Sequence, residues 1–145
     1  MRYNLFIDIE RPREEVFKKF DDPENLAKWQ PGLQEMTLIK GKPGEIGSKH
    51  KILYHMGHRK VEIIETLEAR DAPKRLCGTY EADGVWNRVD NLFEEIDDHS
   101  TRWISEVEFS FRGWTKLMGW LMPGAFKKQS YQYMKNFKEF IENED

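Results

Sequence analysis

The chain has 145 residues, 39% of them hydrophobic and 34% charged, with a formal net charge of −3. This length suits a single domain spanning residues 1–145, and the hydrophobic content excludes an intrinsically disordered chain. The 23 basic residues are scattered among 26 acidic ones without a basic block, so we expect no nucleic-acid partner.

The N-terminal third of the chain predicts one strand followed by two short helices. Residues 3–9 alternate as a strand, whose apolar face consists of Tyr3, Leu5, Ile7 and Ile9. Pro12 opens the first helix, whose inward residues are Val16, Phe17 and Phe20. Asp22 caps the second helix, and Pro31-Gly32 ends it. The inward residues of this second helix are Leu26 and Trp29.

From Leu33 onward, hydrophobic residues repeat at every second position, which is typical of β-strands. The expected strands cover residues 34–40, 46–56, 60–70, 74–82, 85–96 and 101–111. Turn signals rich in Gly, Pro and Asp separate them at residues 41–44, 56–58, 71–73, 83–84 and 97–99. Six consecutive strands joined by short turns predict an antiparallel meander.

The segment 113–124 is rich in Trp, Leu and Met and is broken by three glycines and one proline. It predicts one or two helical turns and then a break before the next helix. One interpretation makes this segment a lid over a cavity or a membrane-touching patch. We favour the other interpretation, in which it packs the helix start onto the sheet edge.

A long helix is expected from Phe126 to about Glu142. Its inward stripe consists of Phe126, Ser130, Tyr133, Met134, Phe137, Phe140 and Ile141. The opposite face consists of Lys127, Lys128, Lys135, Asn136 and Glu139. Because a single aromatic-rich helix laid across one long sheet leaves room between the two layers, the pattern predicts a ligand cavity there.

With this order of elements, the chain resembles the SRPBCC or START-like superfamily, in particular its polyketide cyclase/dehydrase-type branch. The matching features are the segment from Ile9 to Phe17 leading to Trp29, the strand end Asn91-Leu92-Phe93-Glu94-Glu95, the pair Thr101-Arg102 and the terminal helix. The resemblance implies an α+β helix-grip fold. In that fold a curved antiparallel sheet of about seven strands wraps around the C-terminal helix, in the order one strand, two helices, six strands and one helix.

The resemblance also implies a hydrophobic tunnel between the sheet and the final helix. Our leading hypothesis is therefore the binding or carrying of a small hydrophobic ligand, such as a lipid, a sterol or a polyketide-like molecule. The alternatives are a cofactor-independent cyclase, aromatase or dehydratase acting on a polyketide-like substrate, and a protein-interaction or stress-response module. A weak homodimer is left open. The matching features are packing and turn signals, so they identify no reaction.

The expected cavity wall combines the inward faces of strands and helices. Its residues are Trp29, Ile52, Tyr54, Ile63, Phe93, Trp103, Phe109, Phe111, Leu121, Phe126, Ser130, Tyr133, Met134 and Phe137. We expect a void of about 300–1,000 Å³. Its nearest boundaries are Tyr54, Trp103, Phe109, Met134 and Phe137. Three polar residues either orient the ligand or form hydrogen bonds across strands, namely Asn87, Asn91 and Ser105.

Three inward ionisable residues are the catalytic candidates: His50, Tyr54 and Glu65. His50 and Tyr54 share a strand face with Ile52, where an imidazole and a phenol can orient or protonate an oxygenated ligand. Glu65 shares a face with Ile63 and is then a buried carboxylate of raised pKa. Alternatively, a bulge places Glu65 outside, His50 reaches water at the strand start, and Tyr54 fills space at the rim.

Other chemistry finds little support in the sequence. His55 and His58 lie in an expected hairpin turn, with no Cys or carboxylate spaced to complete a tetrahedral metal site. The chain has no Gly-rich phosphate loop, no Ser nucleophile elbow and no HExxH pattern. We therefore expect no metal and no cofactor.

Cys77 is the only cysteine, which excludes an internal disulfide and predicts a small packed side chain. The first residues form no apolar run of signal-peptide length, since Asp8 and Glu10 follow closely. No apolar stretch approaches the roughly 20 residues of a membrane span. We therefore expect a cytoplasmic protein without a membrane span.

Overall fold

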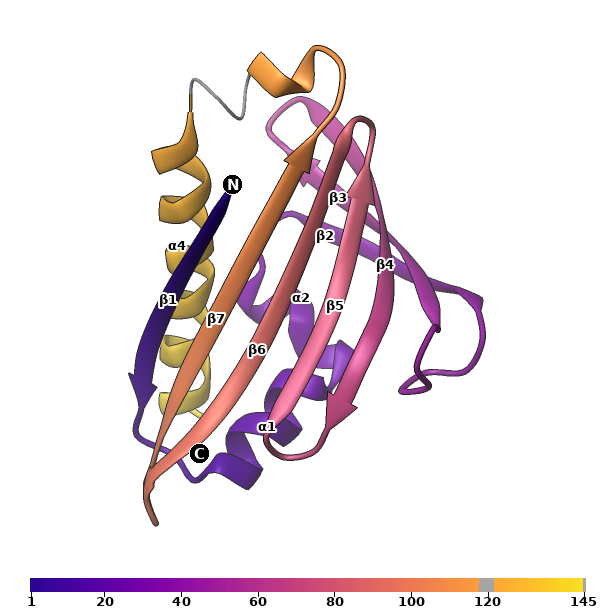
Figure 1. Cartoon of the computed structure of the whole chain (residues 1–145). Helices are drawn as coiled ribbons and strands as arrows, with labels where there is room; N and C mark the ends of the chain where they lie inside the picture. Colours follow the sequence, from indigo (N-terminus) through magenta and orange to yellow (C-terminus); the bar gives the residue numbers. More distant parts are fainter. Residues whose placement is uncertain (118–121, 145) are drawn as a thin grey trace.

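The computed structural model describes residues 1–117 and 122–144 (Figure 1). Its strands are β1 (Arg2–Ile9), β2 (Leu33–Lys40), β3 (Lys49–Met56), β4 (Arg59–Asp71), β5 (Arg75–Ala82), β6 (Val85–Asp97) and β7 (Ser100–Phe111). Its helices are α1 (Arg13–Asp21), the 3-10 helix η1 (Pro23–Asn25), α2 (Leu26–Trp29) and α4 (Pro123–Glu142). Residues 115–117 are also helical. No helix in this described part of the chain is long and apolar enough to cross a membrane.

The seven strands found in the described residues form one antiparallel sheet in the order β1-β7-β6-β5-β4-β3-β2. Strands β2 to β7 form the predicted meander, and β1 pairs with β7, which places Ile7 opposite Trp103. The sheet is twisted and curved, and α4 lies across one of its faces (Figure 1). The predicted α+β helix-grip fold is therefore confirmed.

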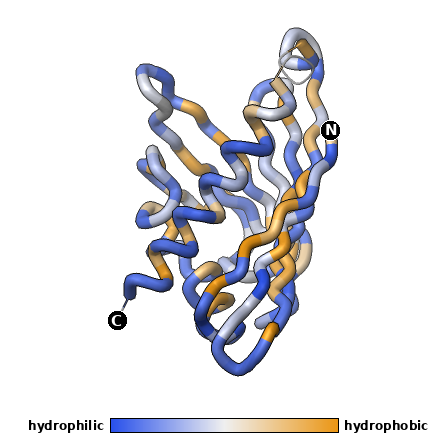
Figure 2. The backbone as a smooth tube through the Cα atoms, turned by 90° about the vertical axis from the view of Figure 1, so that its left-hand side faces the viewer, coloured by the Kyte–Doolittle hydropathy of each residue, from blue (hydrophilic) through white to orange (hydrophobic). Residues whose placement is uncertain are grey.

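The main core lies where α1, α2 and the C-terminal half of α4 meet the sheet. The ring of Phe20 has centroid distances of 5.1–5.5 Å to the rings of Trp29, Phe93, Trp103 and Phe137. Further buried residues of this core are Ile7, Ile9, Val16, Phe17, Met134 and Ile141. Figure 2 shows α4 alternating between hydrophobic and hydrophilic residues, as expected for a helix with one buried face.

The N-terminal helices begin at their predicted signals. Pro12 has a φ of −62° and stands immediately before α1, where a missing N–H has no cost. Asp22 Oδ1 accepts a hydrogen bond from the N–H of Glu24 at 3.0 Å, so Asp22 caps η1 as predicted. These signals bring Trp29, at the end of α2, against the core.

Two predicted boundaries are wrong by three residues. The second strand of the meander begins at residue 49 rather than 46, because the backbone turns just before it. Gly47 has a φ of +88°, and the N–H of Ser48 donates to the Glu45 carbonyl oxygen at 3.0 Å. The final helix begins at Pro123 rather than Phe126, because proline is accepted in the first helical turn.

The segment after β7 is tied to the β5–β6 turn. Thr115 is buried, and its Oγ1 donates to the Gly84 carbonyl oxygen at 2.7 Å. Gly84 has a φ of +72°, and a Cβ there would lie 2.9 Å from the Arg112 carbonyl oxygen, so the turn requires glycine. These contacts pack Thr115 at the sheet edge, as the favoured interpretation expects, whereas the neighbouring Trp114 and Leu117 are exposed. Residues 118–121, including the predicted cavity residue Leu121, lie outside the described residues.

Candidate ligand-binding cavity

Two adjoining compartments lie between the sheet and the helices. The larger, of about 270 Å³, is enclosed mainly by β6, β7 and the first half of α4. The smaller, of about 150 Å³, is enclosed mainly by α2, β3, β4 and β5. Both are smaller than the predicted void, because aromatic rings fill the space under the C-terminal half of α4. Six residues line both compartments, namely Phe20, Trp29, Gln30, Tyr54, Tyr80 and Asn91.

The larger compartment is mainly apolar. Its apolar wall includes Ile63, Val89, Trp103, Val107, Phe109, Phe126, Tyr133 and Met134. Its polar wall residues include Asn87, Asn91, Ser105 and Ser130. The Oγ atom of Ser130 lies 2.7 Å from the Tyr3 hydroxyl, so this polar group already has a partner within the protein. An apolar ligand is therefore the natural occupant.

The structure brings ten of the fourteen predicted cavity residues to these compartments. They are Trp29, Ile52, Tyr54, Ile63, Trp103, Phe109, Phe126, Ser130, Tyr133 and Met134. The prediction is wrong for Phe93 and Phe137. Both are buried in the packed core between the helices and the sheet, where their rings pack against that of Phe20. It is also wrong for Phe111, whose ring stacks on Phe109 with a centroid distance of 5.6 Å and lines neither compartment.

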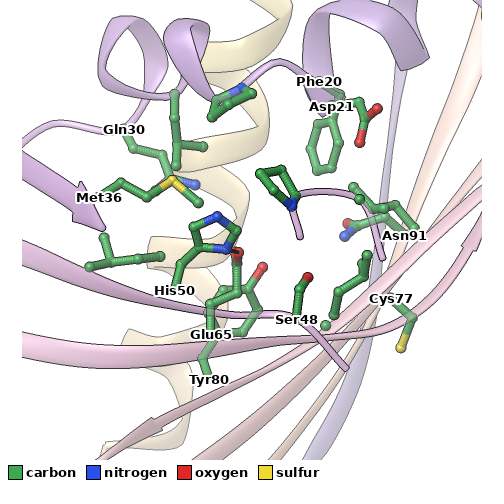
Figure 3. A pocket seen from close by; sticks show the side chains of 18 of the residues that line it. Phe20, Asp21, Gln30, Met36, Ser48, His50, Glu65, Cys77, Tyr80 and Asn91 are labelled. Atoms are coloured by element: carbon green, nitrogen blue, oxygen red, sulfur yellow. Dashed lines mark ion pairs between the residues drawn. The ribbon is translucent and has the colours of Figure 1, made fainter. Parts of the chain in front are cut away.

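Acid–base groups gather in the smaller compartment. His50 lies opposite Glu65 in the β3–β4 pairing, and Glu65 lies opposite Tyr80 in the β4–β5 pairing. The Nδ1 atom of His50 is 3.6 Å from Oε1 of Glu65. Figure 3 shows the three side chains pointing into the same pocket. The alternative that placed Glu65 outside is therefore wrong.

Burial favours the neutral form of each of these groups. It raises the pKa of the Glu65 carboxyl, and the neighbouring Tyr80 hydroxyl offsets this only in part. It lowers the pKa of His50 and raises the pKa of Tyr80 well above its ordinary value. It also raises the pKa of Tyr54, whose hydroxyl donates to Oε1 of Gln30 at 2.6 Å. The cluster can therefore exchange protons or hydrogen bonds with a polar atom of a ligand.

Two polar atoms of residues that line the larger compartment have no hydrogen-bond partner among the described residues, Nε1 of Trp29 and Oδ1 of Asn87, and neither atom is itself exposed to the compartment. An unpaired buried donor or acceptor costs about 1–3 kcal/mol. Asn91 differs, because its Oδ1 accepts a hydrogen bond from Nε1 of Trp103 at 2.9 Å.

The other candidate positions have structural roles. His58 lies in the β3–β4 turn, as predicted, whereas His55 lies within β3, so the prediction that placed it in the turn is wrong. Within residues 1–117 and 122–144, no group of three or more His, Cys, Asp or Glu side chains is placed to hold a metal. Cys77 is buried, and burial raises the pKa of its thiol to about 11, so it is a packed side chain as predicted.

Replacing Glu65 with Gln should change how stability depends on pH. Because the folded-state pKa of Glu65 is raised, ionising this carboxyl at higher pH destabilises the wild-type fold. At a pH below the ordinary carboxyl range the two proteins should be about equally stable. As the pH rises through the raised pKa, the Gln variant should become the more stable protein.

Urea denaturation of both proteins, from a pH below the ordinary carboxyl range to mildly alkaline pH, measures this difference. Glu62→Gln is the matched control, since Glu62 is exposed on the opposite face of the same strand. The control should track wild type across the range. A Glu65→Gln variant that also tracks wild type would contradict the burial of this carboxyl.

The sequence matches one known protein family over almost its whole length. The family described as polyketide cyclase / dehydrase and lipid transport matches residues 2–142. The chain belongs to this family. The predicted membership of the SRPBCC superfamily is thereby confirmed. No curated protein sequence matches the chain.

Solved structures share the fold of this family member at low sequence identity. Ara h 8.0201 is 16% identical with a TM-score of 0.78, and the match covers 99% of each chain. The Zhui aromatase/cyclase of Streptomyces sp. R1128 is 10% identical with a TM-score of 0.79, over 98% of this chain and 93% of that one. Truncated norcoclaurine synthase of Thalictrum flavum is 11% identical with a TM-score of 0.77, over 100% and 95% of the two chains.

Proposed function

We propose that this protein binds and carries a small hydrophobic ligand in the larger compartment. The observation that carries the proposal is a partly open pocket of about 270 Å³ between the sheet and α4, with a mainly aromatic and aliphatic wall. Burying apolar ligand surface there is worth about 25 cal/mol per Å². The description of the matching family includes lipid transport, which supports the same function.

The polar atoms of the cavity narrow the class of ligand. Polar side chains stand beside the apolar ones in its wall, among them Asn87 and Gln129. A purely hydrocarbon ligand would offer these polar groups no hydrogen bond. The compartment is also below the range of about 300–1,000 Å³ that is usual for pockets holding drug-sized ligands. The ligand is therefore a compact, mainly apolar molecule that carries oxygen or nitrogen atoms.

A second candidate function is a cyclase, aromatase or dehydratase reaction. The observation that favours it is the cluster of His50, Glu65 and Tyr80 beside the apolar compartment. Neutral acid and base groups next to a bound polyketone can move protons between its carbon and oxygen atoms. The family description also includes polyketide cyclases and dehydrases. The third hypothesis, a protein-interaction module, expects a closed cavity and receives less support from these open compartments.

A double variant, His50→Phe with Tyr54→Phe, separates the two leading functions. It removes two polar groups and keeps ring-sized side chains in place. The affinity for an apolar fluorescent probe should stay within a few-fold of wild type, because apolar area supplies most of the affinity. Fluorescence titration measures it. The matched control, His99→Phe with Tyr131→Phe, makes the same changes at exposed positions.

Two results would contradict the carrier function. The first is a loss of probe affinity much larger than that of the exposed control, which would show that polar contacts carry the binding. In the second, the wild-type protein turns over a cyclisable polyketone, whereas the double variant does not, although it still binds the probe. That second result would replace the carrier by the enzyme.

A further inference from the structure

An exposed apolar cluster lies where β7 ends and α4 begins. Trp114, Leu117 and Met122 are 71%, 60% and 51% exposed, and we call these three residues the apolar rim. Figure 1 shows the residues after β7 and the first turn of α4 at the same end of the molecule. Single exposed apolar residues are ordinary on a protein surface, but a group of large ones at one end marks an interaction site.

Basic residues flank this rim in the sequence. From Phe109 to Lys138 the sequence has six basic residues and no acidic residue, although the whole chain has a net charge of −3. Four of the six lie near the rim in sequence and are exposed: Arg112, Lys116, Lys127 and Lys128. In the described structure none of these four has a carboxylate within 4.0 Å. Their charges therefore remain available to a partner.

The combination indicates a particular kind of surface. A tryptophan and aliphatic side chains flanked by lysine and arginine suit the boundary between lipid headgroups and acyl chains. Each basic residue near an anionic membrane surface adds attraction without requiring a shaped binding site. We propose that the end of the molecule bearing the apolar rim docks onto an anionic lipid bilayer.

The location of the rim connects docking with the cavity. Phe126, one helical turn after Met122 on α4, lines the larger compartment, and so do Gln129 and Ser130. The ring of Phe126 lies 5.0 Å from that of Phe109 on β7, centroid to centroid. A bilayer at this end therefore lies next to the cavity wall, where a mainly apolar ligand can pass between membrane and protein. Docking itself does not depend on the proposed ligand function.

Vesicle binding of the full chain tests the proposal directly. Sedimentation with sucrose-loaded vesicles should show binding to phosphatidylcholine mixed with phosphatidylglycerol and much weaker binding to phosphatidylcholine alone. Added salt should weaken the binding, because it screens exposed charges beyond about 8–10 Å. Lys127→Glu with Lys128→Glu should reduce the partition into anionic vesicles by roughly tenfold or more.

Matched variants distinguish a docking surface from general charge attraction. Lys40→Glu with Lys42→Glu changes the net charge by the same amount. Both residues are exposed, Lys40 at the end of β2 and Lys42 in the loop after it. This variant should bind anionic vesicles as wild type does. Trp114→Ser with Leu117→Ser should lose binding several-fold, whereas Phe6→Ser, on a 55% exposed residue of β1, should not. Binding of the apolar probe without vesicles should be unchanged in all four variants.

Three results would overturn docking. One is an absence of binding to anionic vesicles, as expected if an acidic protein covers the rim instead. Another is an equal loss from the Lys40/Lys42 and Lys127/Lys128 variants. The last is a normal partition of the Trp114/Leu117 variant. Since probe binding is measured separately, failure of docking leaves the carrier function standing, and failure of probe binding leaves docking standing.

Discussion

Phe137→Ala should lower the free energy of unfolding by about 3–5 kcal/mol, the usual cost of deleting a packed aromatic side chain. Phe137 is fully buried, and its ring lies within 5.2–5.5 Å of the rings of Phe20, Trp29 and Trp103, centroid to centroid. These neighbours belong to three different elements, so they cannot all close on the space that the ring leaves. Chemical denaturation measures the loss.

Tyr131→Ala on the same helix is the matched control. Tyr131 is 38% exposed and contacts Lys135 through its ring, an interaction worth about 0.5–1 kcal/mol at an exposed site. The control should therefore lose less than about 1 kcal/mol. A Phe137→Ala loss no larger than the control would mean that Phe137 lines a void, as the sequence had predicted, and would contradict the packed core described here.

Val89→Trp should abolish most probe binding. Val89 lies on β6 and faces the larger compartment, so an indole there occupies much of its 270 Å³. The buried apolar area available to a ligand falls accordingly, and we expect the affinity to drop by tenfold or more, which corresponds to about 1.4 kcal/mol or more. Fluorescence titration with the same apolar probe measures the change.

Leu92→Trp provides the control on the same strand. Positions 87, 89 and 91 line the compartment, so Leu92, which lines neither compartment, lies on the other face of the sheet. This variant should bind the probe as wild type does. Equal binding by wild type and Val89→Trp would show that the probe sits elsewhere, and so would an equal loss in both variants.

The sequence predicted the fold because its signals are local and repeated. Alternation from Leu33 onward, punctuated by turn residues, defines strands whose order leaves one meander as the simple solution. Pro12 and Asp22 mark the helix starts for reasons of backbone hydrogen bonding alone. The start of β3 was missed because residues 46–48 continue a plausible strand pattern, and only the conformation of Gly47 breaks it.

The site was only partly predictable. The face that holds His50 and Tyr54 was predicted correctly, because lysines mark the opposite face of β3. The position of Glu65 needed the strand register that sets it between His50 and Tyr80. Tyr80 itself was missed, because strand 74–82 has no clear alternation around Gly78.

The packed residues could not be told from the cavity residues by sequence. Phe126 and Phe137 occupy the same stripe of α4, yet one lines the cavity and the other belongs to the core. The difference comes from Phe20 and Trp29, which fill the space beside the C-terminal half of the helix. A helical pattern gives the direction of a side chain but not the distance to the opposing layer.

Amide NMR of the labelled protein, titrated with the apolar probe, tests the ligand-binding claim most directly. The account predicts that the largest shift changes occur at residues lining the larger compartment, among them Val89, Val107 and Tyr133. Residues of the outer sheet face, such as Phe6 and Leu92, should change little. Largest changes at the outer face, or no saturable change at any residue, would contradict binding inside the cavity.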